Sequence, residues 1–409
     1  MRILVVTQYF WPENFPINDF ASGLQDKGHE LEVLTGIPNY PHGRIFQGYS
    51  AFGPARDTFR KMVIHRVPLV PRGNGGRIRL ALNFVSFAVM ASILSPFYCR
   101  KQYDIIFVYE PSPITVALPA LVLKMFKFAP IVFWMQDLWP ESLSATGAIR
   151  SKIVIKIVEL MVRLIYKGCD YILAQSKAFI PSIVQKGGKP DRIFYYPNSA
   201  DSLYRPVSLA TDAAERSLMP DGFRIVFAGN IGAAQDFQNI LTAAEKLRFQ
   251  KSIHWIILGN GRMSNWVEKE IYKRELSDTV HLLGRHPVEA MPRFFALSDA
   301  LLVTLKNDPI FALTIPSKIQ SYLACGKPVV AALNGEGSRI IEEARAGITC
   351  PAEDPDALAE AVTKMYSMSK TERDTIGFNG RLYFEKHFER EGLFDRLERW
   401  MADLKGGVT

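Results

Sequence analysis

The segment TIPSKIQSYLACGKPVVAA, residues 314–332, combines a polar loop with the expected start of a helix. Its chemical groups are the hydroxyls of Thr314 and Ser317 and the ammonium of Lys318. Free N–H groups and the dipole at a helix N-terminus favour a bound phosphate. Ser317 would add a hydrogen-bond donor, and Lys318 would add a full charge. Taken alone, however, the segment favours an ordinary helix start with an exposed lysine.

Two glycine turns follow apolar runs in the same half of the chain. FAGNIGAAQDF (227–237) contains Gly229, Asn230 and Gly232, and LGNGR (258–262) contains Gly259. A residue without a Cβ lets the backbone approach a diphosphate closely. One such turn is weak evidence, because turns need glycine in any case. Together with the lysine loop, the turns predict a single ligand at one edge of a sheet.

Candidate acid and acceptor-side residues occur in the first half. Asp137 ends the run IVFWMQ, where a carboxylate could orient an acceptor hydroxyl or support a developing oxocarbenium charge. The alternative is a helix N-cap before Pro140. Glu110, directly after the run 105–109, is a second candidate. Asn14 in the first loop and His42 in IPNYPHGR are candidate acceptor contacts, although a plain loop histidine fits His42 equally well.

The elements that position these residues are short apolar strands alternating with helices. The alternation runs through the first half and restarts after Asn198, with a polar stretch at 201–222 between the two sets. Such alternation predicts an α/β protein with two doubly wound, Rossmann-like domains. Open parallel sheets bind ligands beyond the carboxyl ends of their strands. Two sheets facing one cleft would therefore hold a donor and an acceptor.

Size and composition agree with this organisation. The 409 residues suit two domains of about 200 residues each. Four cysteines lie far apart, which excludes a recognisable metal knuckle and suggests a reducing compartment. The opening residues, MRILVVT, predict a first strand and contain no long apolar segment of a signal peptide. We therefore expect a cytoplasmic protein.

The net charge of +8 is concentrated in one half. Residues 1–205 carry a net +10, and residues 206–409 carry −2. This asymmetry predicts an anionic partner, either nucleic acid or an anionic bilayer with phosphorylated lipid.

Two helical segments bear on that choice. Leu80–Cys99 has no charged residue over 20 positions, a length that could span a bilayer. Asn83, Ser86 and Pro96 dilute it, which favours a buried crossover helix or an in-plane membrane helix over a span. Residues 150–168 form a basic amphipathic pattern that fits either a solvated helix or a membrane contact.

The motifs together resemble the family 4 glycosyltransferases, retaining enzymes of the GT-B fold. The second half is similar in PNSAD, FAGNIG, LGNG, LSDALLVTL, SKIQSYLACGKPVVA and AGITCPAEDPDALAEAV. In the first half, VYEPSP and QDLWPES resemble the branch that builds bacterial surface polysaccharides on a lipid carrier. That branch includes L-fucosamine transferases.

The resemblance implies an acceptor domain at 1–205, a donor domain at 206–385, and a final helix at 386–409 that returns to the first domain. It implies that the glycine loop 229–232 and Ser317-Lys318 hold a donor diphosphate, with the nucleobase near Gly259 and Arg285. The sequence also departs from the family. Two glutamates common in the family would fall at Leu313 and Ser321, so their donor contacts do not carry over, although Ser321 could bond a ribose hydroxyl.

The resulting expectation is transfer of a sugar, such as N-acetyl-L-fucosamine, from a UDP-sugar to a polyprenyl-diphosphate-linked saccharide of O-antigen type. We expect the protein on the cytoplasmic face of the membrane, bound through its basic N-terminal domain, with no nucleic-acid partner. No cofactor or metal is expected, since there is no Asp-x-Asp motif and Lys318 with a helix dipole can balance the diphosphate. The alternatives are a UDP-sugar 2-epimerase of the same fold and a non-catalytic nucleotide-sugar-binding subunit.

Overall fold

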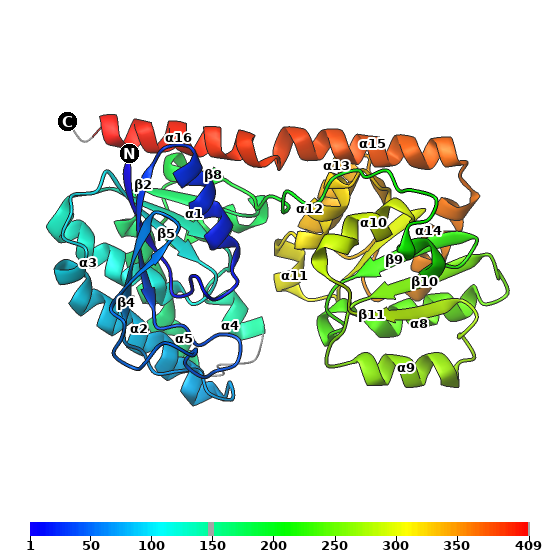
Figure 1. Cartoon of the computed structure of the whole chain (residues 1–409), viewed down its shortest axis with the longest axis horizontal. Coiled ribbons are helices and arrows are strands. Elements are labelled where there is room, and N and C mark those ends of the chain that lie inside the picture. Colours follow the sequence, from blue (N-terminus) through cyan, green and yellow to red (C-terminus); the bar gives the residue numbers. More distant parts are fainter. Residues whose placement is uncertain (146–150, 408–409) are drawn as a thin grey trace. The chain divides into compact units, whose positions relative to one another are not determined.

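The computed structural model describes residues 1–145 and 151–407, which form two compact units (Figure 1). Unit 1 comprises Met1–Tyr196 and the chain from Phe394 onward, and unit 2 comprises Pro197–Leu393. The chain thus passes between the units after Tyr196 and after Leu393, whereas the sequence predicts boundaries after residues 205 and 385. Each unit is an α/β structure with its own parallel sheet, which confirms the predicted pair of Rossmann-like domains.

The sheet of unit 1 has eight strands in the order β3-β4-β2-β1-β5-β6-β7-β8. Neighbouring strands are parallel except β3 and β4, which form an antiparallel pair. The strands are β1 (Arg2–Val6), β2 (Glu30–Gly36), β3 (Arg56–Phe59), β4 (Met62–Val67), β5 (Ile105–Glu110), β6 (Ile131–Met135), β7 (Tyr171–Ala174) and β8 (Ile193–Tyr195). The central strand β5, IIFVYE, is buried at every position, as expected for a strand covered on both faces.

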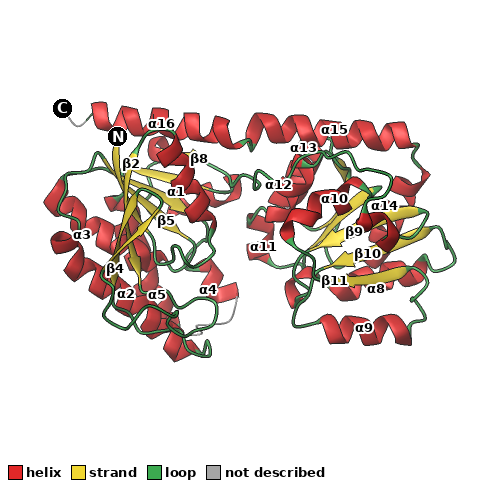
Figure 2. Ribbon diagram, in the orientation of Figure 1, coloured by secondary structure: helices red, strands yellow, loops and turns green. Residues whose placement is uncertain are grey.

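Helices cover both faces of this sheet (Figure 2). Phe20 packs against Trp134, whereas Tyr166 packs against Phe133. Because adjacent strand residues point to opposite faces, the helices of Phe20 and Tyr166 lie on opposite sides of the sheet. The helices of unit 1 are α1 (Pro16–Asp26), α2 (Arg77–Tyr98), α3 (Leu118–Lys127), α4 (Glu141–Ala145), α5 (Lys152–Gly168), α6 (Ile180–Gln185) and most of α16 (Arg390–Gly406).

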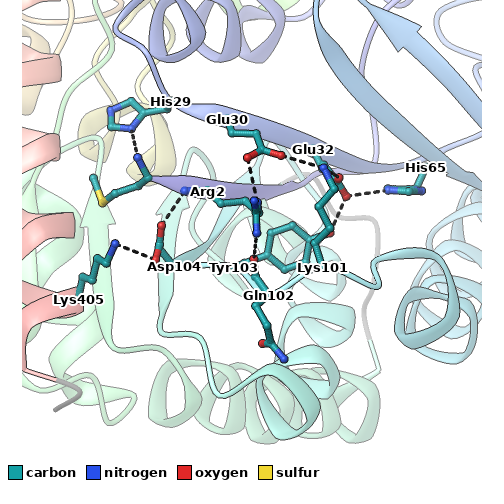
Figure 3. A network of polar contacts seen from close by, with 11 residues as sticks. Arg2, His29, Glu30, Glu32, His65, Lys101, Gln102, Tyr103, Asp104 and Lys405 are labelled. Carbon is teal, nitrogen blue, oxygen red and sulfur yellow. Dashed lines mark hydrogen bonds and ion pairs between the residues drawn. The ribbon is translucent and has the colours of Figure 1, made fainter.

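The helix α16 packs on unit 1 through both rings and charges. Phe394 lies 5.4 Å from Phe20, and Trp400 lies 4.6 Å from Phe194, between ring centroids. A polar network at the amino ends of the strands adds an ion pair of 3.0 Å between Lys405 and Asp104 (Figure 3). The C-terminal helix is therefore part of the structure of unit 1, as the resemblance implies.

The centre of the same network is the carboxylate of Glu32. It accepts a hydrogen bond of 2.6 Å from the Tyr103 hydroxyl and lies 3.0 Å from His65 Nε2 (Figure 3). Burial opposes ionisation of Glu32, but these hydrogen bonds outweigh it and lower its pKa to about 2. This network lies at the end of the sheet away from the carboxyl ends of the strands and braces the amino ends of β1, β2 and β5.

The sheet of unit 2 has six parallel strands in the order β11-β10-β9-β12-β13-β14. The strands are β9 (Phe223–Ala228), β10 (Ile253–Leu258), β11 (Val280–Gly284), β12 (Ala300–Thr304), β13 (Val329–Ala332) and β14 (Gly347–Cys350). The helices are α7 (Ala214–Leu218), α8 (Phe237–Lys246), α9 (Ser264–Lys273), α10 (Met291–Ala296), α11 (Pro309–Leu313), α12 (Ser317–Ala324), α13 (Glu336–Glu343), α14 (Pro355–Ser367) and α15 (Lys370–His387).

The apolar segment at residues 80–99 forms most of α2. Among the described residues, α2 is the one helix long and apolar enough to cross a membrane, by length and composition alone. Only 28% of its most apolar window is buried, so α2 is not the buried crossover helix that the sequence allows. Its polar residue Asn83, in contrast, is fully buried.

Candidate functional site

The two predicted glycine turns of unit 2 meet at the carboxyl ends of neighbouring strands. Gly229 N, after β9, donates to Leu258 O over 2.8 Å, and Gly259 N, after β10, donates to Gly284 O over 2.7 Å. Ile231 N donates to Asn260 O over 3.0 Å, which holds the two turns side by side. The loops after β9, β10 and β11 thus form one edge, as the sequence predicts.

Glycine is required at the centre of this edge. Gly229 and Gly259 both have φ of +139°, a conformation that L side chains rarely adopt. A Cβ on Gly259 would lie 1.8 Å from Gly229 O, so only hydrogen fits between the two turns. A Cβ on Gly229 would lie 2.7 Å from Cε of Lys318. The lysine side chain therefore lies directly over the first glycine turn.

Lys318, in the first turn of α12, is the cation of this site. Its ammonium lies 3.5 Å from the centroid of the Phe227 ring and makes no hydrogen bond or ion pair with any described residue. Burial lowers its pKa from 10.5 to about 7. Pro316 at the N-cap offers no side-chain acceptor, so no side chain caps the helix. An anion bound here would meet a partly desolvated ammonium and the positive end of α12.

Three other predicted donor-side residues lie on α12 and at the end of α11. Ser317 is exposed at the first position of α12, and the Ser321 hydroxyl donates to Ser317 O over 3.2 Å. Thr314 closes α11 by donating to Phe311 O over 3.2 Å. The nearby carboxylate of Asp308 caps the same helix by accepting from Ile310 N over 2.9 Å.

Three further predicted residues lie on the glycine loops themselves. Asn230 is exposed, and its amide nitrogen would lie 2.5 Å from a Cβ on Gly232. Arg285 is exposed directly after Gly284, whose carbonyl bonds the Gly259 turn. The structure thus places Gly229, Asn230, Gly232, Gly259 and Arg285 on neighbouring loops with Lys318 over the first of them, and Thr314, Ser317 and Ser321 at the end of α11 and along α12.

Several polar residues behind this edge were not predicted. Asp236 is buried with φ of +48°, and burial raises the pKa of its carboxyl. Asn239, in the first turn of α8, is also buried, and neither of its amide atoms has a hydrogen-bond partner among the described residues. Phe227 was not predicted either, because its contact with Lys318 joins residues 91 positions apart. The sequence QDFQN at residues 235–239 shows that polar residues follow the first glycine turn, but it does not predict that Asp236 and Asn239 are buried.

In unit 1 the two predicted acidic residues lie together at the carboxyl ends of β5 and β6. Glu110 is fully buried, and its Oε2 accepts from Asp137 N over 3.3 Å. Burial, and then the charge of Asp137, raise the pKa of Glu110 well above its usual range. Asp137 Oδ1 accepts from Leu138 N over 3.0 Å and from the Ser142 hydroxyl. Glu110 therefore supports the Asp137 loop from below, and Asp137 is the more accessible of the two carboxyls.

The predicted residues Asn14 and His42 lie on other loops of unit 1. Both are exposed, on the loops after β1 and β2, and neither contacts Asp137 in the part of the chain that the structure describes. The neighbouring Glu13 was not predicted. It is buried, and its Oε1 accepts from Asn39 N and Tyr40 N over 2.8 and 2.7 Å, so it joins these two loops. Burial raises the pKa of Glu13 to about 7, although these two bonds oppose the shift.

A second cation without a carboxylate partner lies above the same loops. The Arg72 guanidinium lies 5.0 Å from the Tyr40 ring centroid and donates to the Tyr9 hydroxyl over 2.9 Å. No acidic side chain among the described residues forms an ion pair with it. Arg72 was missed because its partners are aromatic rings from two distant loops.

Comparison with known proteins assigns a class to this arrangement. Residues 17–199 match the model of the Glycosyl transferase 4-like domain, and residues 211–382 match that of Glycosyl transferases group 1. The two matches follow one another along the chain and fall on unit 1 and unit 2. With two Rossmann-like sheets of this topology, the chain is a glycosyltransferase of the GT-B type.

Two relatives are named as glycosyltransferases. The chain is 24% identical to WcaI of Escherichia coli (strain K12), named for glycosyl transfer in colanic acid biosynthesis, over 99% of this chain and all of that protein. It is 26% identical to the glycosyltransferase WbjE of Pseudomonas aeruginosa over 72% of this chain and 74% of that protein.

Solved structures agree on the fold. A sucrose-phosphate synthase from Thermosynechococcus elongatus superposes with a TM-score of 0.75 at 14% identity, over 99% of both chains. Anabaena HepE in complex with UDP superposes with a TM-score of 0.71 at 16% identity, over 98% of this chain and 100% of that one. At these identities the likeness establishes the fold alone.

Proposed function

We propose that this glycosyltransferase moves a sugar from a UDP-sugar to a polyprenyl-diphosphate-linked saccharide during synthesis of a bacterial surface polysaccharide. The sugar that the motifs favour is N-acetyl-L-fucosamine, and we expect retention of its anomeric configuration. Unit 2 binds the donor, and unit 1 binds the acceptor. The protein works in the cytoplasm as a peripheral protein on the inner face of the cell membrane.

The observation that carries the proposal is the position of Lys318. Its ammonium lies over the Gly229 turn and has no anionic partner among the described residues. A diphosphate accepted by this turn and by the start of α12 would supply that partner. As the bond between the sugar and the diphosphate breaks, negative charge grows on the leaving phosphate, and a fixed ammonium stabilises it. This role requires no metal ion.

The acceptor side is assigned to unit 1. Asp137 lies at the carboxyl end of the sheet with its loop held by Glu110. In the proposed reaction, Asp137 orients the acceptor hydroxyl or supports positive charge on the sugar ring. Arg72 offers a guanidinium without a carboxylate partner among the described residues, which suits a phosphate of the lipid-linked acceptor. Asn14 and His42 are expected to contact the acceptor sugar.

The relatives support the proposal through their names. HepE has been crystallised with UDP and with UDP-glucose, and WcaI is named for colanic acid biosynthesis. Two other functions suit the same fold: a UDP-sugar 2-epimerase, and a subunit that binds a nucleotide sugar without transferring it. The second is favoured by one observation, the absence of both family glutamates at Leu313 and Ser321.

The test is transfer of radiolabelled sugar to a polyprenyl-diphosphate-GlcNAc acceptor from a panel of UDP-, GDP- and dTDP-sugars. The proposal predicts labelled lipid with a UDP-sugar. Labelled lipid with a GDP- or dTDP-sugar alone would contradict the assigned nucleotide. UDP binding without transfer, tested over several acceptors, would favour the non-catalytic subunit.

A further inference from the structure

The outward side of α2 is apolar along its whole length. Six large apolar side chains recur every three or four residues, so they share one side of the helix. They are Ile78, Leu82, Val85, Val89, Ile93 and Phe97, each between 48 and 79% exposed. The opposite side of α2 packs on the sheet through fully buried residues such as Phe87 and Ala91. A soluble surface helix normally shows the reverse pattern, with polar residues outward.

Two more helices extend this apolar surface. Exposed apolar side chains occur at the end of α3 and along one side of α5: Met125, Phe126, Phe128, Ile153, Val154, Ile157, Leu160 and Leu164. We call the exposed side of these three helices the α2–α3–α5 face. It holds 14 of the 23 exposed large hydrophobic side chains among the described residues. Soluble monomers rarely expose apolar patches beyond a few hundred Å², so this concentration points to a partner.

The three helices are neighbours in unit 1. Lys127 Nζ, in the last turn of α3, donates to Arg100 O just after α2, over 3.0 Å. Lys124 Nζ donates to Gly168 O at the end of α5, also over 3.0 Å. A Cβ on Gly168 would lie 2.3 Å from Leu121 of α3, so α5 and α3 approach closely. Figure 1 draws α2 and α3 next to one another along one side of unit 1.

The charges of these helices are predominantly positive. The three helices carry eight basic residues and one acidic residue, Glu159, which pairs with Arg163. The basic residues are Arg77, Arg79, Lys124, Lys127, Lys152, Lys156, Arg163 and Lys167. Lys152 and Lys156 are exposed and form no ion pair with any described residue. An apolar surface with basic residues among and around its apolar side chains complements an anionic bilayer, where acyl chains lie beneath phosphate groups.

We infer that the α2–α3–α5 face docks unit 1 on an anionic phospholipid bilayer, with α2 and α5 lying in the plane of the interface. The inference rests on the proposed function only in the claim that this bilayer carries the acceptor lipid. The exposed apolar side chains enter the region between headgroups and acyl chains, and the lysines and arginines contact lipid phosphates.

The polar residues of α2 explain why it lies in the plane and does not span the bilayer. Asn83 Nδ2 donates to Val70 O over 2.7 Å, and its Oδ1 accepts from Gln8 Nε2 over 2.8 Å. The Ser86 hydroxyl accepts from Val70 N over 2.9 Å. A spanning α2 would break these contacts with the loops after β1 and β4, and would place an unpartnered amide in hydrocarbon. Gln8 lies in the loop after β1, so α2 is bonded to the carboxyl edge of the unit 1 sheet.

The experiment is sedimentation of the full-length protein with phosphatidylcholine vesicles and with vesicles that also contain phosphatidylglycerol. The wild-type protein should bind the phosphatidylglycerol vesicles at least tenfold more tightly. The variant Leu82→Ser/Val89→Ser/Ile93→Ser should lose at least tenfold of this binding, since three apolar side chains no longer leave water. Lys152→Gln/Lys156→Gln should lose about fivefold for each charge removed.

Matched controls come from unit 2. Phe249→Ser/Tyr272→Ser/Phe378→Ser removes three apolar side chains that are more exposed than Leu82, Val89 and Ile93, and Lys269→Gln/Lys364→Gln removes two exposed charges. Both should bind vesicles as the wild type does. Every variant should keep its UDP affinity and thermal unfolding midpoint, which shows that it is folded.

Unchanged vesicle binding in the α2–α3–α5 variants would overturn the inference. Resistance of the bound wild-type protein to carbonate extraction would also overturn it, because it would indicate that α2 spans the bilayer. A dimer in solution that the serine variant dissociates would overturn it as well, because it would indicate that a second copy of the chain covers this face. Transfer to a water-soluble acceptor without vesicle binding would refute this inference and leave the proposed transfer reaction standing. Vesicle binding without any transfer would support the docking face and contradict the proposed transfer reaction.

Discussion

Lys318 Nζ lies 3.5 Å from the centroid of the Phe227 ring, at the point where β9 ends and α12 begins. An aromatic face attracts an ammonium without neutralising it. Arg66, a buried cation of unit 1, pairs in contrast with Asp57 over 2.9 Å. Lys318 has no such partner among the described residues. Its pKa is lowered because burial without an anionic partner disfavours the charged ammonium. The site therefore favours an anion, which would bring the missing charge.

Removing this ammonium should weaken nucleotide binding. Lys318→Ala is expected to raise the Kd for UDP about 10- to 100-fold, because a hydrogen bond to a charged group contributes about 1.5–3 kcal/mol. Isothermal titration calorimetry measures the change directly. Lys364→Ala removes an exposed lysine of α14 and should leave the Kd unchanged. Equal affinity of Lys318→Ala and the wild type would refute the diphosphate assignment.

The affinity for UDP should also fall as pH rises. The free protein holds the pKa of Lys318 at about 7, so most of the ammonium is lost by pH 8.5. A bound diphosphate favours the charged form and raises this pKa, so binding must take up a proton. Between pH 7.5 and 9, above the second phosphate pKa of about 6, the Kd should rise by up to about tenfold per pH unit.

Calorimetry in buffers of different ionisation enthalpy gives the number of protons taken up. We expect up to about one proton per UDP at pH 8.5 for the wild type and none from this source for Lys318→Met. Proton uptake that persists unchanged in Lys318→Met would assign the linkage to another group.

The glycine turns should differ in their tolerance of a methyl group. Gly259→Ala places a Cβ 1.8 Å from a backbone oxygen and should destabilise unit 2 by more than about 4 kcal/mol. Gly284→Ala is the matched control. Gly284 also has a positive φ, +72°, but a Cβ there meets open space, so only the conformational cost of about 1–2 kcal/mol remains. Chemical denaturation followed by Trp fluorescence compares them, and equal losses would argue against close approach of the two turns.

Glu110 should act in its neutral form. The pKa of Glu110 is raised, so above about pH 4.3 its carboxyl stays protonated in the folded protein but ionises in the unfolded chain. The folded protein therefore binds more protons, and the contribution of Glu110 to the free energy of unfolding falls as pH rises above about 4.3. Glu110→Gln should remove this slope and keep the Asp137 loop in place. Glu110→Ala should cost about 2–4 kcal/mol, since it leaves a cavity and an unpartnered Asp137 N–H.

Urea denaturation from pH 5 to 8 measures both effects. A Gln variant with the same pH slope as the wild type would show that Glu110 is ionised in the folded protein. A fully active Ala variant would show that the Asp137 loop needs no support from Glu110.

Local pattern was sufficient to predict the two sheets and the donor-side edge. The strand runs are continuous and apolar because both faces are covered, and the glycine turns follow them directly. That Lys318 lies beside the glycine turns could be predicted, because the ends of parallel strands and the starts of the helices that follow them share one edge of a sheet. What could not be predicted is long-range. The Phe227 ring under Lys318, the Glu13 carboxylate that joins two loops, and the rings beneath Arg72 come together only in the folded chain.

The environment of the helix α2 could not be predicted from the sequence either. Its composition admits a span, a core helix or an interfacial helix, and the printed residues do not distinguish them. The decision comes from the bonds of Asn83 to Val70 and Gln8, which fix one side of the helix against unit 1 and leave the apolar side exposed.

The most direct test of the account is the stoichiometry of a reaction containing a labelled UDP-sugar and the polyprenyl-diphosphate-linked acceptor in anionic vesicles. The account predicts one UDP released for each labelled sugar that enters the lipid, no release without acceptor, and a rate reduced at least tenfold in Lys318→Ala. Conversion of the sugar in the absence of acceptor would instead identify an epimerase. Tight UDP binding with no labelled lipid from any donor would contradict the assignment of a transferase reaction to this site.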